Sequence, residues 1–90
     1  MTKHINIKVD GHVQGVGYRY HARAVAFRLG LRGYIKNTPD GGVFIEAEGE
    51  PEMLNSFVKW CEQGPIHAHV ENVTVTRGEV KDYSAFEIIK

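Results

Sequence analysis

One stretch, from His12 to Arg19, constrains the fold of this 90-residue chain more than any other part of its sequence. Before it, Ile5, Ile7 and Val9 alternate with polar residues, which is the pattern of a strand with one buried face. After it, a helical pattern of apolar residues begins near Tyr20. The stretch itself carries two glycines. It therefore predicts a tight turn between a strand and the N-terminus of a helix.

This turn has the features of a cradle for an anion. The backbone N–H groups at the start of a helix have no partner within the helix, and the helix dipole places partial positive charge there. Gly15 and Gly17 allow the backbone to close around a ligand without a Cβ in the way. Arg19 adds a planar set of donors that fits two phosphate oxygens at once. The stretch thus favours an anion, with a phosphoryl group as the best match.

Two well-known phosphate loops do not fit these residues. The dinucleotide-binding fingerprint would need a third glycine at position 20, where the chain has Tyr20. A P-loop needs Gly-Lys-Ser or Gly-Lys-Thr, which does not follow. Taken alone, the loop is equally consistent with a plain turn between a strand and a helix.

The overall composition indicates one small domain covering residues 1–90. With 42% hydrophobic and 24% charged residues, the chain has material for a single modest core. No apolar run is long enough to span a membrane, and the first residues lack the apolar segment of a signal peptide. Cys61 is the only cysteine and has no partner for an internal disulfide. We therefore expect a cytoplasmic protein without a membrane partner, and a buried structural role for Cys61.

The charges cancel overall but are unevenly distributed. Eleven basic and eleven acidic residues give a formal net charge of zero, which argues against a nucleic-acid partner. No Asp or Glu occurs between Gly11 and Pro39, whereas four arginines and one lysine do. The cradle therefore lies in a positive half of the chain, which would attract a small anion. The alternative is that these surface charges average out once the chain is folded.

Periodicity along the rest of the chain predicts a mixture of strands and helices. The expected elements are strands at 5–10, 32–37, 43–48 and 72–76, a short strand at 86–88, and helices from about 20 to 29 and from 51 to 63. Residues 38–42, TPDGG, join the second and third strands as a hairpin, and residues 77–84 form a polar connection. The order βαββαβ, with one further strand, predicts an α+β fold. We expect the ferredoxin-like split βαβ sandwich, an antiparallel sheet with two helices on one face.

Two motifs of the chain closely resemble those of the acylphosphatase family. Residues 11–19, GHVQGVGYR, resemble the family's signature, and residues 33–41, GYIKNTPDG, resemble its second motif. The resemblance implies the ferredoxin-like fold and hydrolysis of the carboxyl–phosphate bond of acyl phosphates, without a metal or another cofactor. It also implies that Arg19 binds the phosphate and that Asn37 positions the attacking water. We expect a monomer that takes a small-molecule acyl phosphate, releases inorganic phosphate and holds the phosphoryl group in a cradle of Gln14, Gly15, Val16, Gly17, Tyr18 and Arg19.

The chemistry of acyl phosphates is compatible with these residues. The departing carboxylate is a good leaving group and needs no general acid. What remains is to hold three phosphoryl oxygens and to place a water in line with the leaving group. Asn37 is no base at neutral pH, but its amide can accept a hydrogen bond from a water and orient it. Without the resemblance, Asn37 before Thr-Pro-Asp-Gly would be interpreted as a turn residue.

Several other residues near these motifs have less specific interpretations. Ala22 stands where many members of the family have threonine, so a secondary hydrogen bond is expected to be missing. His67 and His69 would share one face of a strand, but no third metal ligand is close in sequence and we expect them in a loop. We expect His12 in the loop near the rim of the cradle and His21 on a solvated helix face.

Two other classes of function compete with an enzyme. An RNA-binding module shares the βαββαβ order, but it would need stacking aromatic residues on the first and third strands, where only Phe44 is present. A non-catalytic anion-sensing domain would keep the cradle and Arg19 but would not need Asn37. Turnover of an acyl phosphate separates the enzyme from the sensor.

Overall fold

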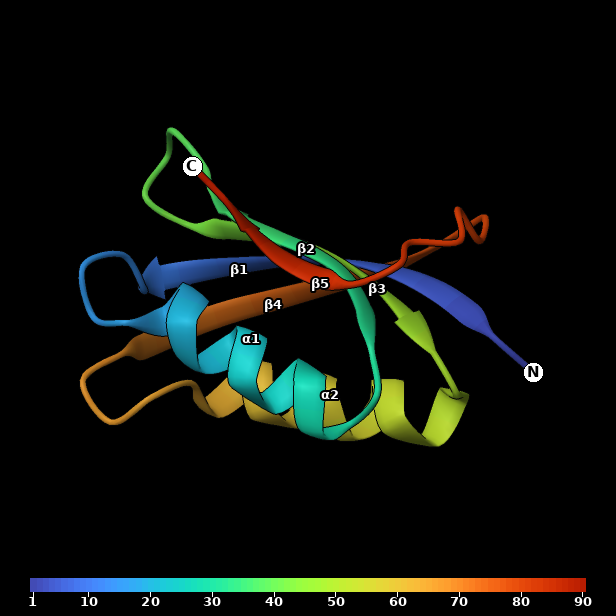
Figure 1. Ribbon diagram of the computed structural model, residues 1–90. Coiled ribbons are helices and arrows are strands. Elements are labelled where there is room, and N and C mark those ends of the chain that lie inside the picture. Colours follow the sequence, from blue (N-terminus) through green and yellow to red (C-terminus); the bar gives the residue numbers. More distant parts are fainter.

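The computed structural model describes residues 1–90 as a five-stranded sheet with both helices on one of its faces (Figure 1). The strands are β1 (Lys3–His12), β2 (Arg32–Asn37), β3 (Val43–Gly49), β4 (His69–Gly78) and β5 (Phe86–Ile89), and the helices are α1 (Tyr18–Arg28) and α2 (Pro51–Gln63). The strand order across the sheet is β4-β1-β3-β2-β5. This is the predicted ferredoxin-like layout. Neither helix combines the length and the apolar character needed to cross a membrane.

The sheet is mixed, which corrects the expectation of an antiparallel sheet. β1 pairs antiparallel with β3 and β4, and β3 pairs antiparallel with β2. β5 instead pairs parallel with β2, from Phe86 opposite Gly33 to Ile89 opposite Lys36. The reason is the connection after β4. It crosses from one edge of the sheet to the other, so that β5 runs beside β2 in the same direction (Figure 1).

Strands β1 and β4 are longer than their sequence patterns predict. β4 covers ten residues, and its pairing with β1 continues to His12 opposite His69. The register shifts between Asp10 and Gly11, where Glu71 of β4 has no partner on β1, and the pairing then continues past this bulge. Gly11 suits the position opposite the bulge, since its φ of 132° is one that L side chains rarely adopt. A Cβ at Gly11 would also collide with the carbonyl of His69. His12 and His69 are therefore strand residues rather than loop residues, and only His67 lies in a turn.

The core fills the space between the sheet and the helices. The predicted apolar helix faces are confirmed, with these residues buried: Ala22, Val25 and Ala26 of α1, and Leu54, Phe57 and Cys61 of α2. Burial raises the pKa of the Cys61 thiol to about 12. The thiol is therefore neutral at physiological pH, as expected for a structural cysteine.

Tyr18 joins the start of α1 to the end of α2. The helix begins at this residue, two positions before the expected start, and the Tyr18 side chain is part of the core. Its hydroxyl donates a hydrogen bond of 2.8 Å to the carbonyl of Cys61. In a regular helix that carbonyl would accept from the N–H four residues later, but that residue is Pro65, which has no N–H. Tyr18 thus satisfies a buried acceptor while it fixes α1 against α2.

The connection between β4 and β5 is anchored to the outer face of the sheet by two carboxylates. Alternation along β3 directs Glu46 and Glu48 away from the helices, yet both are buried. Glu48 accepts hydrogen bonds from the backbone N–H groups of Lys81 and Tyr83. Glu46 accepts from the hydroxyls of Tyr34 and Tyr83, each at 2.7 Å, and from Lys81 Nζ at 3.0 Å. The predicted polar connection is therefore a fixed part of the fold.

Glu46 makes the stability of the fold dependent on pH. Burial by itself would raise the pKa of this carboxyl, but the hydrogen bonds from Tyr34, Tyr83 and Lys81 outweigh burial and lower the pKa from 4.5 to about 2. Because the folded pKa lies below the unfolded value, the stabilisation is present above pH 4.5 and is lost as the pH falls toward 2. We predict that the free energy of unfolding, measured with urea, decreases in this window and that Glu46→Gln removes part of the decrease.

The matched control for this prediction is Glu62→Gln, which changes an exposed carboxylate of α2. Its acid dependence should follow that of the unaltered chain. If Glu46→Gln left the pH profile unchanged as well, Glu46 would not be one of the groups that link protonation to unfolding.

Candidate functional site

The loop between β1 and α1 is shaped by two glycines in the left-handed region. Gly15 has a φ of 76° and Gly17 a φ of 79°, values that other residues rarely adopt. Gly17 is also the N-cap of α1, and no side chain caps this end of the helix. His21 holds the loop from within α1, because its Nδ1 donates to the carbonyl of Gly17 at 2.8 Å. The N–H groups at the start of α1 remain available for a ligand.

Gln14 ties this loop to the turn between β2 and β3. Its Nε2 donates hydrogen bonds of 2.8 Å to the carbonyls of both Thr38 and Gly42. Both carbonyls belong to the turn that follows Asn37. Because the amide uses its two N–H donors on the same turn, the loop and the turn are fixed relative to one another. This side-chain role is additional to the place of Gln14 in the expected cradle.

The turn between β2 and β3 is shaped by Asp40. Its carboxylate accepts hydrogen bonds from the Thr38 hydroxyl and from the Gly42 N–H at 3.1 Å, and it pairs with Lys8 of β1 at 3.0 Å. The hydrogen bonds from Thr38, then from Lys8 and Gly42, lower the pKa of this carboxyl to about 2. Asp40 is therefore charged at neutral pH and stabilises the turn that follows Asn37, the last residue of β2.

A hollow of about 200 Å³ lies where the loop, the start of α1 and the end of β2 meet. Six residues expected at the site line it: Gln14, Gly15, Gly17, Tyr18, Arg19 and Asn37. The β1–α1 loop, the β2–β3 turn and the C-terminus lie at the same end of the sheet (Figure 1). Val16 was expected in the cradle but does not line the hollow, because it packs against the core.

Val13, the first residue of the loop 13–19 whose backbone amides were expected to hold the anion, also lines the hollow. Two further lining residues were not expected from the sequence: Tyr20 and Ile88. Tyr20 could have been found from its place directly after Arg19. Ile88 belongs to β5, and the carbonyl of its neighbour Ile89 accepts a hydrogen bond of 3.3 Å from Arg19 Nη1. No sequence signal indicates these contacts, since they depend on the pairing of β5 with β2.

Three other residues singled out near the motifs, His12, His21 and Ala22, do not line the hollow. His21 is exposed and directed to the loop carbonyl, and Ala22 is fully buried in the core. His12 is exposed at the end of β1. Nowhere in the chain do three or more His, Cys, Asp or Glu side chains come together as a group that could hold a metal ion.

The lining of the hollow determines what chemistry it can support. No acidic side chain and no histidine lines it, and α1 has no acidic residue in its first turn. The Arg19 guanidinium and the helix N-terminus therefore favour a small anion there. Since the lining has neither a carboxylate nor an imidazole to act as general base or acid, the site suits a leaving group that departs without a proton.

Comparisons with known proteins agree on one family. The family model described as Acylphosphatase matches residues 5–88. An acylphosphatase of Archaeoglobus fulgidus is 46% identical over 84 residues, which cover 93% of this chain and 94% of the relative. The crystal structure of acylphosphatase from Bacillus subtilis superimposes with a TM-score of 0.95 at 37% identity and covers both chains fully. An acylphosphatase structure from Coxiella burnetii gives a TM-score of 0.95 at 36% identity, covering 98% of this chain and 93% of that one.

We predict that the Gln14 side chain stabilises the fold by joining the β1–α1 loop to the β2–β3 turn. Gln14→Leu keeps the size of the side chain but removes both donors to the β2–β3 turn. We expect the free energy of unfolding, measured with urea, to fall by about 1–2 kcal/mol. Gln63→Leu, at the exposed end of α2, is the control and should change it little. Equal stability of the two variants would contradict this role.

Proposed function

Because the chain belongs to the acylphosphatase family and is an enzyme that acts on acyl phosphates, we propose which of its groups carry out the hydrolysis. The phosphoryl group of a small-molecule acyl phosphate is held by Arg19 and by the backbone amides of residues 13–19. Asn37 orients a water for in-line attack on phosphorus. The products are a carboxylate and inorganic phosphate, and no metal or other cofactor takes part.

The bonds and protons balance without a catalytic acid or base. An oxygen–phosphorus bond forms between the water and the phosphoryl group while the bond from phosphorus to the carboxylate oxygen breaks. The electron pair of that bond leaves with the carboxylate, and a proton of the water passes to a phosphate oxygen. Arg19 and the amide N–H groups stabilise the charge spread over the phosphoryl oxygens, and the Asn37 side-chain oxygen accepts from the water.

One observation supports this assignment above the others. Arg19 at the start of α1 and Asn37 at the end of β2 line the same hollow, which contains no acidic side chain to repel a phosphate. The proposed enzyme is a monomer in which residues 1–90 act as one acylphosphatase domain.

The direct test of the function is hydrolysis of benzoyl phosphate by the purified protein with excess chelator present. Rapid hydrolysis that the chelator does not slow is the expected result. If there were no turnover while inorganic phosphate still protected the protein against heat, the hollow would bind an anion without acting on it. That outcome would favour the anion-sensing alternative.

Arg19 is predicted to be required in its particular shape, and not only for its charge. Arg19→Lys retains the positive charge but cannot donate to two phosphoryl oxygens from one planar group. We expect kcat/KM for benzoyl phosphate to fall by roughly 10²-fold or more, together with the protection by inorganic phosphate. Arg77→Lys, at an exposed arginine of β4 outside the hollow, serves as the control. Activity of Arg19→Lys equal to that of the unaltered enzyme would contradict this role.

Asn37 is predicted to act on turnover and not on phosphate binding. In Asn37→Ala we expect kcat to fall by roughly 10²–10³-fold, as for the loss of a positioned polar group at other active sites. Inorganic phosphate should still raise the melting temperature as much as it does in the unaltered protein. Asn55→Ala, on the exposed surface of α2, is the matched control. An equal loss of phosphate binding and turnover would assign Asn37 to holding the phosphoryl group instead.

A further inference from the structure

A second hollow, of about 350 Å³, lies on the outer face of α1. It is lined by Tyr20, Arg23, Ala24, Phe27 and Arg28. Tyr20 also lines the hollow that contains Arg19 and Asn37, so the two hollows adjoin one another. A ligand held by Arg19 can therefore extend into the second hollow past Tyr20.

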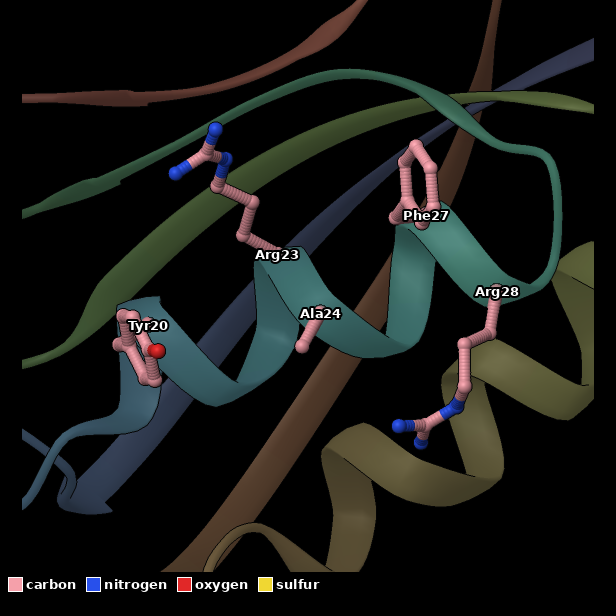
Figure 2. A pocket seen from close by; sticks show the side chains of 5 residues that line it. All are labelled: Tyr20, Arg23, Ala24, Phe27 and Arg28. Atoms are coloured by element: carbon pink, nitrogen blue, oxygen red, sulfur yellow. The ribbon is translucent and has the colours of Figure 1, made fainter.

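The surface of this second hollow combines apolar rings with a positive charge. Tyr20 is 69% exposed and Phe27 is 82% exposed, so both present aromatic surface to solvent. Figure 2 shows Arg23 and Phe27 extending to the same side of α1 and Arg28 extending to the opposite side. Arg23 therefore shares its side of the helix with an exposed ring.

Arg23 has no counter-charge of its own. It takes part in none of the ion pairs of the structure, and the chain has no Asp or Glu between Gly11 and Pro39. Arg23 follows Arg19 by four residues in α1, so the two residues lie on one face of the helix with Cβ atoms roughly 5–6 Å apart. A molecule whose phosphoryl group binds Arg19 thus brings its next few atoms toward Arg23.

We propose that this face of α1 is the subsite for the acyl end of the substrate and that it favours acyl groups carrying a second negative charge. The inference rests on the proposed function, since it takes the cradle to hold the phosphoryl group. Tyr20 and Phe27 provide apolar surface for the body of the acyl group. The Arg23 guanidinium pairs with the second anionic group, which can be a carboxylate or a phosphate.

Two non-hydrolysable ligands that differ in one charge test the subsite: benzoylphosphonate and 4-carboxybenzoylphosphonate, with binding measured by calorimetry at low salt. The unaltered protein should bind the carboxylated compound roughly two- to fivefold more tightly, as for a partly exposed ion pair. Arg23→Gln should abolish this preference and leave the affinity for benzoylphosphonate within about twofold. Arg77→Gln, which removes the same charge from an exposed residue of β4 outside both hollows, should keep the preference.

The outcomes separate this inference from the proposed function, because binding is measured without turnover. Two results would overturn the subsite even if benzoyl phosphate is hydrolysed. One is that the unaltered protein binds the two phosphonates with equal affinity, and the other is that Arg23→Gln still prefers the carboxylated compound. Equal affinities are also the result expected if this face of α1 docks another protein instead. Loss of the preference in Arg23→Gln would support the subsite even if no turnover were detected. Absence of binding to either phosphonate would overturn both.

Discussion

Two hydrogen bonds from a single amide, that of Gln14, join the two halves of the candidate site. Arg19 also donates to the carbonyl of Ile89, and Asp40 also pairs with Lys8 of β1, but neither contact joins the loop before α1 to the turn after β2. Left-handed glycines shape the loop before α1, and Asp40 shapes the turn between β2 and β3. Neither of these determines where the loop lies relative to the turn. The bonds from Gln14 to the carbonyls of Thr38 and Gly42 do so, and they bring Arg19 and Asn37 to one hollow.

The two faces of the sheet support this arrangement in different ways. On the helix face, the bond from Tyr18 to the carbonyl of Cys61 fixes the start of α1, and with it the amide groups of the cradle. On the outer face, Glu46 and Glu48 anchor the connection that carries the chain from β4 to β5. Since β5 supplies a carbonyl that accepts from Arg19, this distant carboxylate pair also supports the site.

Local patterns in the sequence were sufficient for most of the elements but not for their pairing. The helix faces and the hairpin of β2 and β3 follow from apolar periodicity and from the turn residues 38–42. The parallel placement of β5 beside β2 was missed because it depends on a crossover at long sequence separation. The extension of β4 to His69 was missed because the pairing with β1 continues past a bulge at Glu71. Arg19 and Asn37 were found because they belong to the two sequence motifs. Ile88 was not found, because it reaches the hollow only through the pairing of β5 with β2.

The central claim is that water attacks phosphorus in a group held by Arg19 and backbone amides, with no base beyond the substrate itself. The most direct test is hydrolysis of benzoyl phosphate in ¹⁸O-labelled water, followed by mass spectrometry of both products. The label should appear in inorganic phosphate and not in benzoate, because the bond between phosphorus and the carboxylate oxygen breaks. Label in benzoate would show attack at the carbonyl carbon and would contradict the proposed roles of Arg19 and Asn37.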